Sequence, residues 1–277
     1  MALRQQIPNL LTLCGLACGS LSAALAFPHP GLLDTHLYWA AIALLLAGVF
    51  DVLDGLAARL LKATSAQGQV LDSLADLVSF GLAPGLMLFS LLSHYTYAYL
   101  PGTATGADWS TWPTLARLSC LLLPLGAAWR LARFSSDNTP RPYFQGLPAP
   151  ANGLFVAGLI FLFYVERSHL SPFILVPDNT LLSYTLDKPA NVVLLNGLLA
   201  GLMVSRWPML SFKFKGRSWR QYKWHYLFLG CSILLLLLLG PLGTLPVGLL
   251  YVLCSHLARK TYATTATAAS AATPDHD

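Results

Sequence analysis

The sequence predicts an all-α polytopic membrane protein, a helix bundle with about eight transmembrane helices. Of its 277 residues, 55% are hydrophobic and only 10% are charged, whereas soluble domains carry about 25% charged residues. Long apolar runs support the same class, and the clearest is the uncharged stretch 227–239. A chain with so little polar material has lipid as its natural solvent.

The apolar stretches divide the chain into segments that are mostly close to the roughly 20 residues needed to cross a bilayer. The expected spans are 8–27, 36–61, 69–97, 113–134, 150–166, 190–206, 223–240 and 243–258. The second and third are longer than a bilayer requires, so we expect them to tilt or project. Together they form one membrane domain over 1–260, and the small, polar segment 261–277 is expected to be a disordered tail.

The basic residues give the expected orientation. Of the 17 Lys and Arg residues, all but Arg117, Arg167 and Lys188 lie in or beside connections on the side of the N-terminus. Cytoplasmic loops carry such an excess, so this side is predicted to be cytoplasmic and the number of spans even. The net charge of +5 is spread over these connections, which argues against a nucleic-acid surface.

Four of the chain's acids fall close together inside apolar sequence: Asp51, Asp54, Asp72 and Asp76. An acid at the bilayer centre costs about 2.5–3.5 kcal/mol on insertion scales, so these residues need compensation. Asp51 and Asp54 share a helix face at i, i+3, and Asp72 and Asp76 share one at i, i+4. The short polar connection 63–67 makes the two helices antiparallel neighbours, so the two pairs are expected to converge at the cytoplasmic end.

Carboxylates alone, without His or Cys, favour hard cations such as Mg²⁺ or Mn²⁺ over zinc. Four carboxylates suffice for two divalent ions, and paired ions stabilise phosphoryl displacement by clamping the attacking and leaving oxygens. Two other interpretations of the spacing remain open at this point. The aspartates could form a structural polar cluster, or they could line the ion pathway of a cation transporter.

The aspartates also belong to a longer pattern, D-x2-D-G-x2-A-R-x8-G-x3-D-x3-D. Its eight defined positions are occupied by Asp51, Asp54, Gly55, Ala58, Arg59, Gly68, Asp72 and Asp76. This pattern resembles the signature of the CDP-alcohol phosphatidyltransferases. The resemblance implies that the four aspartates bind the metals and that Asp76 is also the general base. It further implies that Gly55, Ala58, Arg59 and Gly68 lie against the CDP moiety of the substrate.

The flanking segments 7–13, 72–85, 129–134, 144–153 and 203–213 are similar to those of bacterial membrane-type phosphatidylserine synthases. That similarity implies CDP-diacylglycerol and L-serine as substrates, a homodimer, and a site facing the cytoplasm at the bacterial cytoplasmic membrane. Glycerol-3-phosphate or inositol phosphate remains an alternative acceptor.

Four further residues are candidates for substrate contacts. Arg130 and Arg133 are one turn apart and could bind the serine carboxylate or a lipid phosphate, because guanidinium groups hold such anions at two points. Anchoring to lipid headgroups is the alternative for both. Asn9 and Thr12 share a face of the first helix and could bind the nucleotide, although capping or packing would also explain them.

Overall fold

The structure is a computed structural model, and it describes residues 3–27, 33–99, 111–137, 143–168, 189–210 and 219–271. Nearly all of these residues are helical. The helical elements in chain order are α1 (Leu3–Leu25), α2 (Leu33–Leu60), α3 (Ala66–Asp76), η1 (Leu77–Leu82), α4 (Ala83–Tyr99), α5 (Thr111–Leu118), η2 (Ser119–Leu121), α6 (Leu122–Ser136), α7 (Ala149–Ser168), α9 (Pro189–Val204), α10 (Trp219–Leu239), η3 (Gly240–Gly243) and α11 (Thr244–Ala271).

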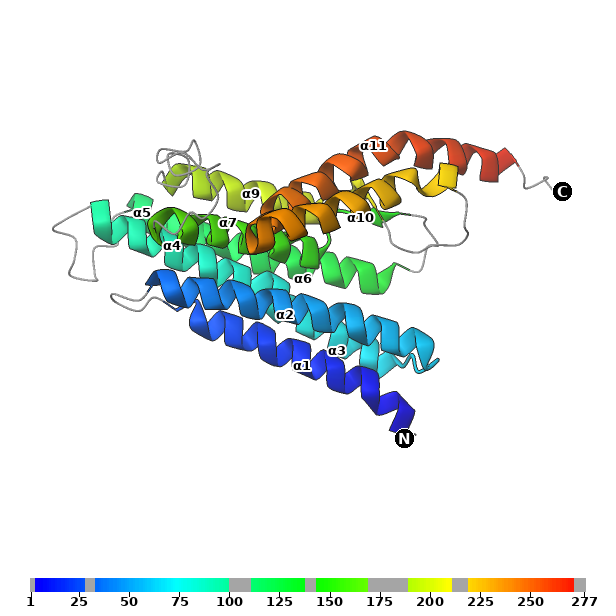
Figure 1. Ribbon diagram of the computed structural model, residues 1–277, viewed down its shortest axis with the longest axis horizontal. Coiled ribbons are helices and arrows are strands. Elements are labelled where there is room, and N and C mark those ends of the chain that lie inside the picture. Colours follow the sequence, from blue (N-terminus) through cyan, green and yellow to red (C-terminus); the bar gives the residue numbers. More distant parts are fainter. Residues whose placement is uncertain are drawn as a thin grey trace.

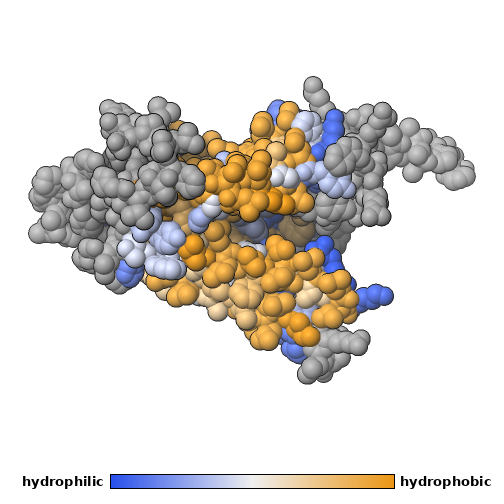
Figure 2. Space-filling view, in the orientation of Figure 1, coloured by the Kyte–Doolittle hydropathy of each residue, from blue (hydrophilic) through white to orange (hydrophobic). Residues whose placement is uncertain are grey.

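The membrane character of the fold is confirmed. Five helical stretches are long and apolar enough to cross a bilayer: Gln6–Leu25, Thr35–Leu60, Ala66–Ser93, Thr114–Ser136 and Lys223–Arg259. Ala149–Val165 and Ala190–Val204 are shorter apolar helices, and the last long stretch contains both α10 and α11. The chain is therefore an all-α integral membrane protein, while the number of eight spans stays a prediction. Figure 2 shows the apolar belt that the described side chains form across the molecule.

The helices run roughly parallel or antiparallel to one another and form layers (Figure 1). α1, α2 and α3 lie on one side, α9, α10 and α11 lie on the other, and α4, α6 and α7 fill the space between them. α2 and α11 each pack on α7, and α6 packs on α9. The start of α1, the α2–α3 connection and the end of α6 all lie at the same end of the bundle (Figure 1).

Two of the predicted spans contain a break in their α-helical hydrogen bonding. The span expected at 69–97 is α3, the π-helical turn η1 and α4, and the span expected at 113–134 is α5, the 3₁₀ turn η2 and α6. A proline follows each break, Pro84 after η1 and Pro124 after η2. Proline has no N–H to donate to the carbonyl four residues earlier, which interrupts the regular helix.

A small β-ribbon lies beside the end of α6, where no strand was expected. β1 (Phe144–Gln145) pairs antiparallel with β2 (Pro208–Met209), with Phe144 opposite Met209. Helix α11 holds the residue after β2 through both of its backbone groups. The Tyr251 hydroxyl donates to the Leu210 carbonyl at 2.9 Å, and the Leu210 N–H donates to the Ser255 hydroxyl at 3.1 Å. The last two helices are thereby attached to the rest of the bundle.

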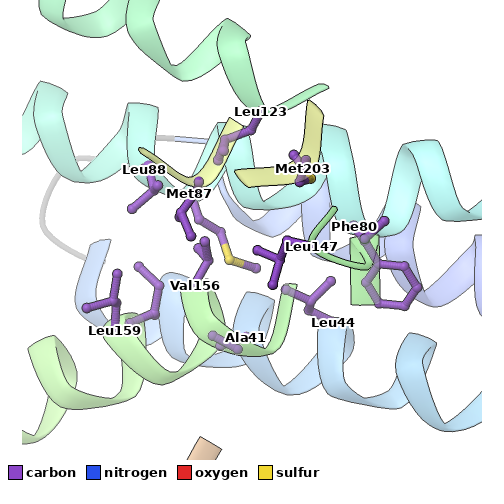
Figure 3. Close-up of a cluster of buried hydrophobic side chains, with 14 of the residues drawn as sticks. Ala41, Leu44, Phe80, Met87, Leu88, Leu123, Leu147, Val156, Leu159 and Met203 are labelled. Atoms are coloured by element: carbon purple, nitrogen blue, oxygen red, sulfur yellow. The ribbon is translucent and has the colours of Figure 1, made fainter. Parts of the chain in front are cut away.

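The core runs along the middle of the bundle between α2, α4 and α7. Its fully buried side chains include Leu44, Met87 and Val156. Figure 3 shows Phe80 of η1 next to Leu44 and Leu147 within this cluster. The π turn that follows the second aspartate pair is therefore part of the hydrophobic core.

The end of α11 differs from expectation. The helix continues to Ala271 and so includes much of the segment that was expected to be a disordered tail. The disorder of the tail therefore stays a prediction. The last residues, 272–277, lie outside the described part of the chain.

Candidate metal centre

The four aspartates lie on two consecutive helices, at the end of α2 and in α3. Helix α3 begins with a side-chain cap, in which the Ser65 hydroxyl accepts the N–H of Gly68 at 3.0 Å. A serine in this position satisfies one of the N–H groups that a helix leaves unpaired at its start. The cap sets where α3 begins, and Asp72 and Asp76 follow in its second and third turns.

Asp51, Asp72 and Asp76 come together in space as the sequence predicts. One carboxylate oxygen from each of the three residues lies within 4.8 Å of the other two. Oxygen ligands stand about 2.0–2.6 Å from Mg²⁺ or Ca²⁺, so two oxygens on opposite sides of one ion are about 4–5 Å apart. The spacing of the three carboxylates therefore fits one divalent ion held by all of them.

Electrostatics give a second reason for a cation here. Two like charges 4.8 Å apart repel by about 3.5 kcal/mol at an effective dielectric constant of 20. The three aspartates form three such pairs, so their ionised forms destabilise one another strongly. A divalent ion between them would turn this repulsion into attraction.

Asp54 lies beside this group and is nearly buried, with 6% of its surface exposed. Its carboxylate lies near the Thr12 side chain, whose hydroxyl donates its single proton to the carbonyl of Pro8 at 3.0 Å. Thr12 therefore contacts the aspartate cluster from α1. Asn9 is on α1 as well. Its side chain lies next to α3, the second of the two helices that carry the signature.

Asn9 approaches α3 at the glycine of the signature. A Cβ atom added to Gly68 would lie 2.9 Å from the Asn9 side-chain oxygen and 3.0 Å from the Ser65 hydroxyl. Any larger residue would therefore push Asn9 away from the start of α3. Both polar residues predicted from the first helix thus lie next to signature residues.

The remaining signature residues lie at the end of α2. In the described structure a Cβ added to Gly55 would approach only the flexible guanidinium of Arg59, at 3.7 Å, and Ala58 is half-buried. Arg59 is exposed, and its Nε donates to the Gly55 carbonyl at 2.8 Å on its own helix. Gly55 and Ala58 thus leave room next to the aspartates, while Arg59 lies along α2.

Arg130 and Arg133 look alike in the sequence, but the structure separates them. Arg130 lies close enough to Asp76 for their charges to attract, and its buried Nε has no hydrogen-bond partner among the described residues. Arg133 instead donates to the Val204 carbonyl at the end of α9, at 2.8 Å. Arg130 therefore belongs to the aspartate centre, whereas Arg133 connects two helices.

Two residues near the centre were missed by the sequence interpretation. Tyr251 of α11 lies near Arg130, although the last two spans gave no functional signal. Asn152 of α7 donates from its side-chain nitrogen to the Phe80 carbonyl at 3.0 Å, one turn after Asp76. Pro84 is the sequence signal that could have predicted such a residue. Proline has no N–H for the carbonyl of residue 80, four residues earlier, so this carbonyl needs a donor from elsewhere.

Comparison with known proteins gives the same family as the signature. The family model of the CDP-alcohol phosphatidyltransferases matches residues 5–185. Three relatives are each named CDP-diacylglycerol–serine O-phosphatidyltransferase. The protein of Mycobacterium leprae is 34% identical over 166 residues, that of Bacillus subtilis 30% over 158, and that of Helicobacter pylori strain J99 36% over 157.

These alignments cover 57%, 57% and 56% of this chain in the same order. They cover 47% of the Mycobacterium protein, 76% of the Bacillus protein and 57% of the Helicobacter protein. The chain thus spans about half the length of two of these three relatives. Because the family model matches well over half of the chain and includes the whole aspartate centre, this protein belongs to the CDP-alcohol phosphatidyltransferase family.

Proposed function

We propose that this protein transfers the phosphatidyl group of CDP-diacylglycerol to the hydroxyl of L-serine, giving phosphatidylserine and CMP. The observation that carries the proposal is the convergence of the Asp51, Asp72 and Asp76 carboxylates beside the guanidinium of Arg130. The names of the relatives support serine as the acceptor.

In the reaction, the serine hydroxyl oxygen forms a bond to the phosphorus that carries diacylglycerol, and the bond from that phosphorus to CMP breaks. Asp76 accepts the hydroxyl proton as general base, which places this proton on a carboxylate oxygen. Asp51, Asp54, Asp72 and Asp76 would hold two divalent ions, Mg²⁺ or Mn²⁺. When bound, such ions neutralise charge on the phosphate oxygens of the substrate and of the leaving group.

The residues around the aspartates would bind the two substrates. Gly55, Ala58 and Gly68 leave space for the CDP moiety, with Arg59 near its phosphates and with Asn9 and Thr12 as hydrogen-bonding groups on α1. Arg130 would hold the serine carboxylate or a lipid phosphate, because its buried Nε still lacks a partner among the described residues. A neutral amino acid needs one such cation, whereas an acceptor that carries a phosphate needs more positive charge.

The orientation and assembly are proposed as well. The positive-inside distribution of Lys and Arg supports a cytoplasmic position for the end of the bundle that carries the aspartates. There a lipid substrate in the bacterial cytoplasmic membrane meets a water-soluble acceptor from the cytosol. We also propose a homodimer, as the family resemblance implies, and chemical cross-linking in native membranes would test it.

The test is CMP release by the purified protein in detergent, with CDP-diacylglycerol and Mn²⁺ or Mg²⁺, in the presence and absence of L-serine. We expect serine-dependent CMP release and formation of phosphatidylserine. CMP release with glycerol-3-phosphate or inositol phosphate, but not with serine, would show that the acceptor is one of these phosphates and not serine. No release with any acceptor, combined with Mn²⁺ flux into vesicles, would support a cation transporter instead.

A further inference from the structure

We propose that the π turn η1, clamped by Asn152, sets the rotation of the α3 helix that brings Asp72 and Asp76 to Asp51. Asn152 is in this sense a positioning residue that acts through the backbone of Phe80. The inference concerns the geometry of the metal centre; its link to turnover rests on the proposed function, but its test does not.

The first observation is the hydrogen bonding of the turn itself. In η1 the N–H of Ala83 donates to the carbonyl of Val78, five residues earlier, instead of four as in an α-helix. The next residue is Pro84, which has no N–H for the Phe80 carbonyl four residues before it. The side chain of Asn152, fully buried in α7, donates to that carbonyl at 3.0 Å. Asn152 thus supplies from another helix the donor that Pro84 lacks.

The second observation is the close packing of other helices around the turn. A Cβ added to Gly153, the neighbour of Asn152, would lie 2.7 Å from the ring of Phe80. A Cβ added to Gly19 of α1 would lie 2.8 Å from the Cα of Ser79. Such distances leave no room for a side chain, so α7 packs closely on the Phe80 ring and α1 on the backbone of the turn. The turn is therefore held on two sides as well as by a hydrogen bond.

The consequence for the metal centre follows from helix geometry. A π turn adds one residue to a helix, and one residue corresponds to a rotation of about 100°. Beyond the turn, α4 buries Met87, Leu88 and Leu91 in the core. If the same helix ran without the extra residue and α4 kept its packing, the face of α3 that carries Asp72 and Asp76 would rotate away from Asp51. The π turn thus allows one span to present an apolar face to the core and an acidic face to α2.

The test is Mn²⁺ binding by the purified full-length protein in detergent, measured by electron paramagnetic resonance without any substrate. Asn152→Leu keeps the approximate volume but removes the donor to Phe80. We expect Mn²⁺ affinity to fall about 10- to 100-fold, the usual effect of losing a residue that orients metal ligands. Asn196→Leu is the matched control, because Asn196 is also fully buried and donates at 2.9 Å, but to the Ser119 hydroxyl of η2 and not to the π turn. This control should lose thermal stability and keep its Mn²⁺ affinity.

Pro84→Ala distinguishes two roles of Asn152: positioning the metal ligands through the π turn, and merely providing a hydrogen-bond donor to the Phe80 carbonyl. Alanine provides the missing N–H and allows a regular helix, so Pro84→Ala combined with Asn152→Leu should regain Tm without regaining Mn²⁺ affinity. Pro84→Ala alone removes no buried donor, and we expect it to fold and to bind Mn²⁺ more weakly than the wild type. If Asn152→Leu does not fold, the Mn²⁺ affinity of Pro84→Ala alone tests the inference.

Three results would overturn the inference. The first is wild-type Mn²⁺ affinity in Asn152→Leu or in Pro84→Ala, because the turn would then not position the ligands. The second is equal weakening in Asn152→Leu and Asn196→Leu, which would indicate general destabilisation. The third is recovery of both Tm and Mn²⁺ affinity in the double variant. None of these results depends on whether serine is the acceptor, so they are distinct from a failure of the proposed function.

Discussion

The aspartate hairpin, α2–α3, and the C-terminal hairpin, α10–α11, are both helix pairs with a short connection, and their functions differ. Each connection contains a residue with positive φ, Lys62 at 49° and Gly240 at 56°. The aspartate hairpin places three carboxylates within 4.8 Å of one another. The C-terminal hairpin exposes large apolar residues such as Leu237, which is 79% exposed. Two helix pairs of similar construction thus differ in their side chains. The aspartate hairpin gathers carboxylates, whereas the C-terminal hairpin exposes an apolar surface suited to lipid.

The C-terminal hairpin is nevertheless more than a lipid-facing addition. Its helix α11 holds both backbone groups of Leu210, and its Tyr251 lies near Arg130. It lies beyond residues 5–185, which the family model matches. The comparison therefore predicts that changes in the aspartate hairpin affect turnover and that changes in the C-terminal hairpin mainly affect stability.

The largest effect is expected for Asp76→Asn. It removes the proposed proton acceptor while keeping the size and polarity of the side chain, so kcat should fall by about 10²- to 10⁴-fold. Because Asp76 is also one of the three clustered carboxylates, Mn²⁺ affinity should fall as well, so kcat is measured at saturating Mn²⁺; binding of CDP-diacylglycerol should be largely retained. Ser73→Ala is the control on the same helix, because the Ser73 hydroxyl donates to the Gln69 carbonyl of its own turn. Wild-type turnover in Asp76→Asn would remove Asp76 from the role of general base.

Removing the metal should destabilise the aspartate hairpin. Because the ionised Asp51, Asp72 and Asp76 repel one another, the chelated protein should have a lower Tm and no activity. Adding Mn²⁺ at about 100 times its Kd should stabilise the fold by about 2.7 kcal/mol. Thermal unfolding with and without Mn²⁺ measures this difference, and Asp72→Asn should reduce it. An equal Mn²⁺ effect in wild type and Asp72→Asn would place the bound ion elsewhere.

The two arginines of α6 should separate in kinetics. Arg130→Lys keeps a positive charge but loses the planar guanidinium, so we expect a higher KM for serine or for CDP-diacylglycerol. Arg133→Lys should leave both KM values unchanged and lower the stability by about 1.5–3 kcal/mol, through loss of the charged bond to the Val204 carbonyl. If replacing both arginines left the serine KM and turnover unchanged, neither would bind substrate.

A smaller effect is expected for Tyr251→Phe in the C-terminal hairpin. The ring keeps its edge contact with Phe228, whose centroid is 5.6 Å away, and the hydroxyl bond to the Leu210 carbonyl is lost. We expect a loss of about 0.5–1.5 kcal/mol in unfolding free energy. Ser255→Ala, which removes the other bond to Leu210, is the matched variant. If Tyr251→Phe lost as much turnover as Asp76→Asn, the prediction that the C-terminal hairpin mainly affects stability would be wrong.

The smallest effects are expected at the two connections. Lys62 adopts a left-handed conformation that costs an L-residue about 1–2 kcal/mol, so Lys62→Gly should raise Tm slightly. Gly240→Ala should lower it slightly for the same reason. Opposite signs in thermal unfolding would confirm that both residues are held in the left-handed conformation, whereas two shifts of the same sign would contradict it.

Much of the site could be predicted because its information is local. The spacing of Asp51 and Asp54, and of Asp72 and Asp76, determines which helix face each pair occupies, and the short connection then brings the faces together. Asn9 and Thr12 lie next to signature residues, and their binding of the nucleotide stays a prediction. Arg59 was harder, since a long side chain with free rotation could reach a phosphate or its own helix, and here it bonds to the Gly55 carbonyl.

The sequence by itself determined the membrane environment, the helical class and the grouping of the acids, because hydrophobicity and helical periodicity act over short stretches of chain. Only the tertiary structure decided that Arg130, and not Arg133, meets Asp76, and that Asn152 supplies the donor missing at Pro84. These contacts join residues about 50 to 70 positions apart, such as Asp76 with Arg130 and Phe80 with Asn152. They depend on how the helices are rotated and packed, which the spacing of residues along one helix does not specify.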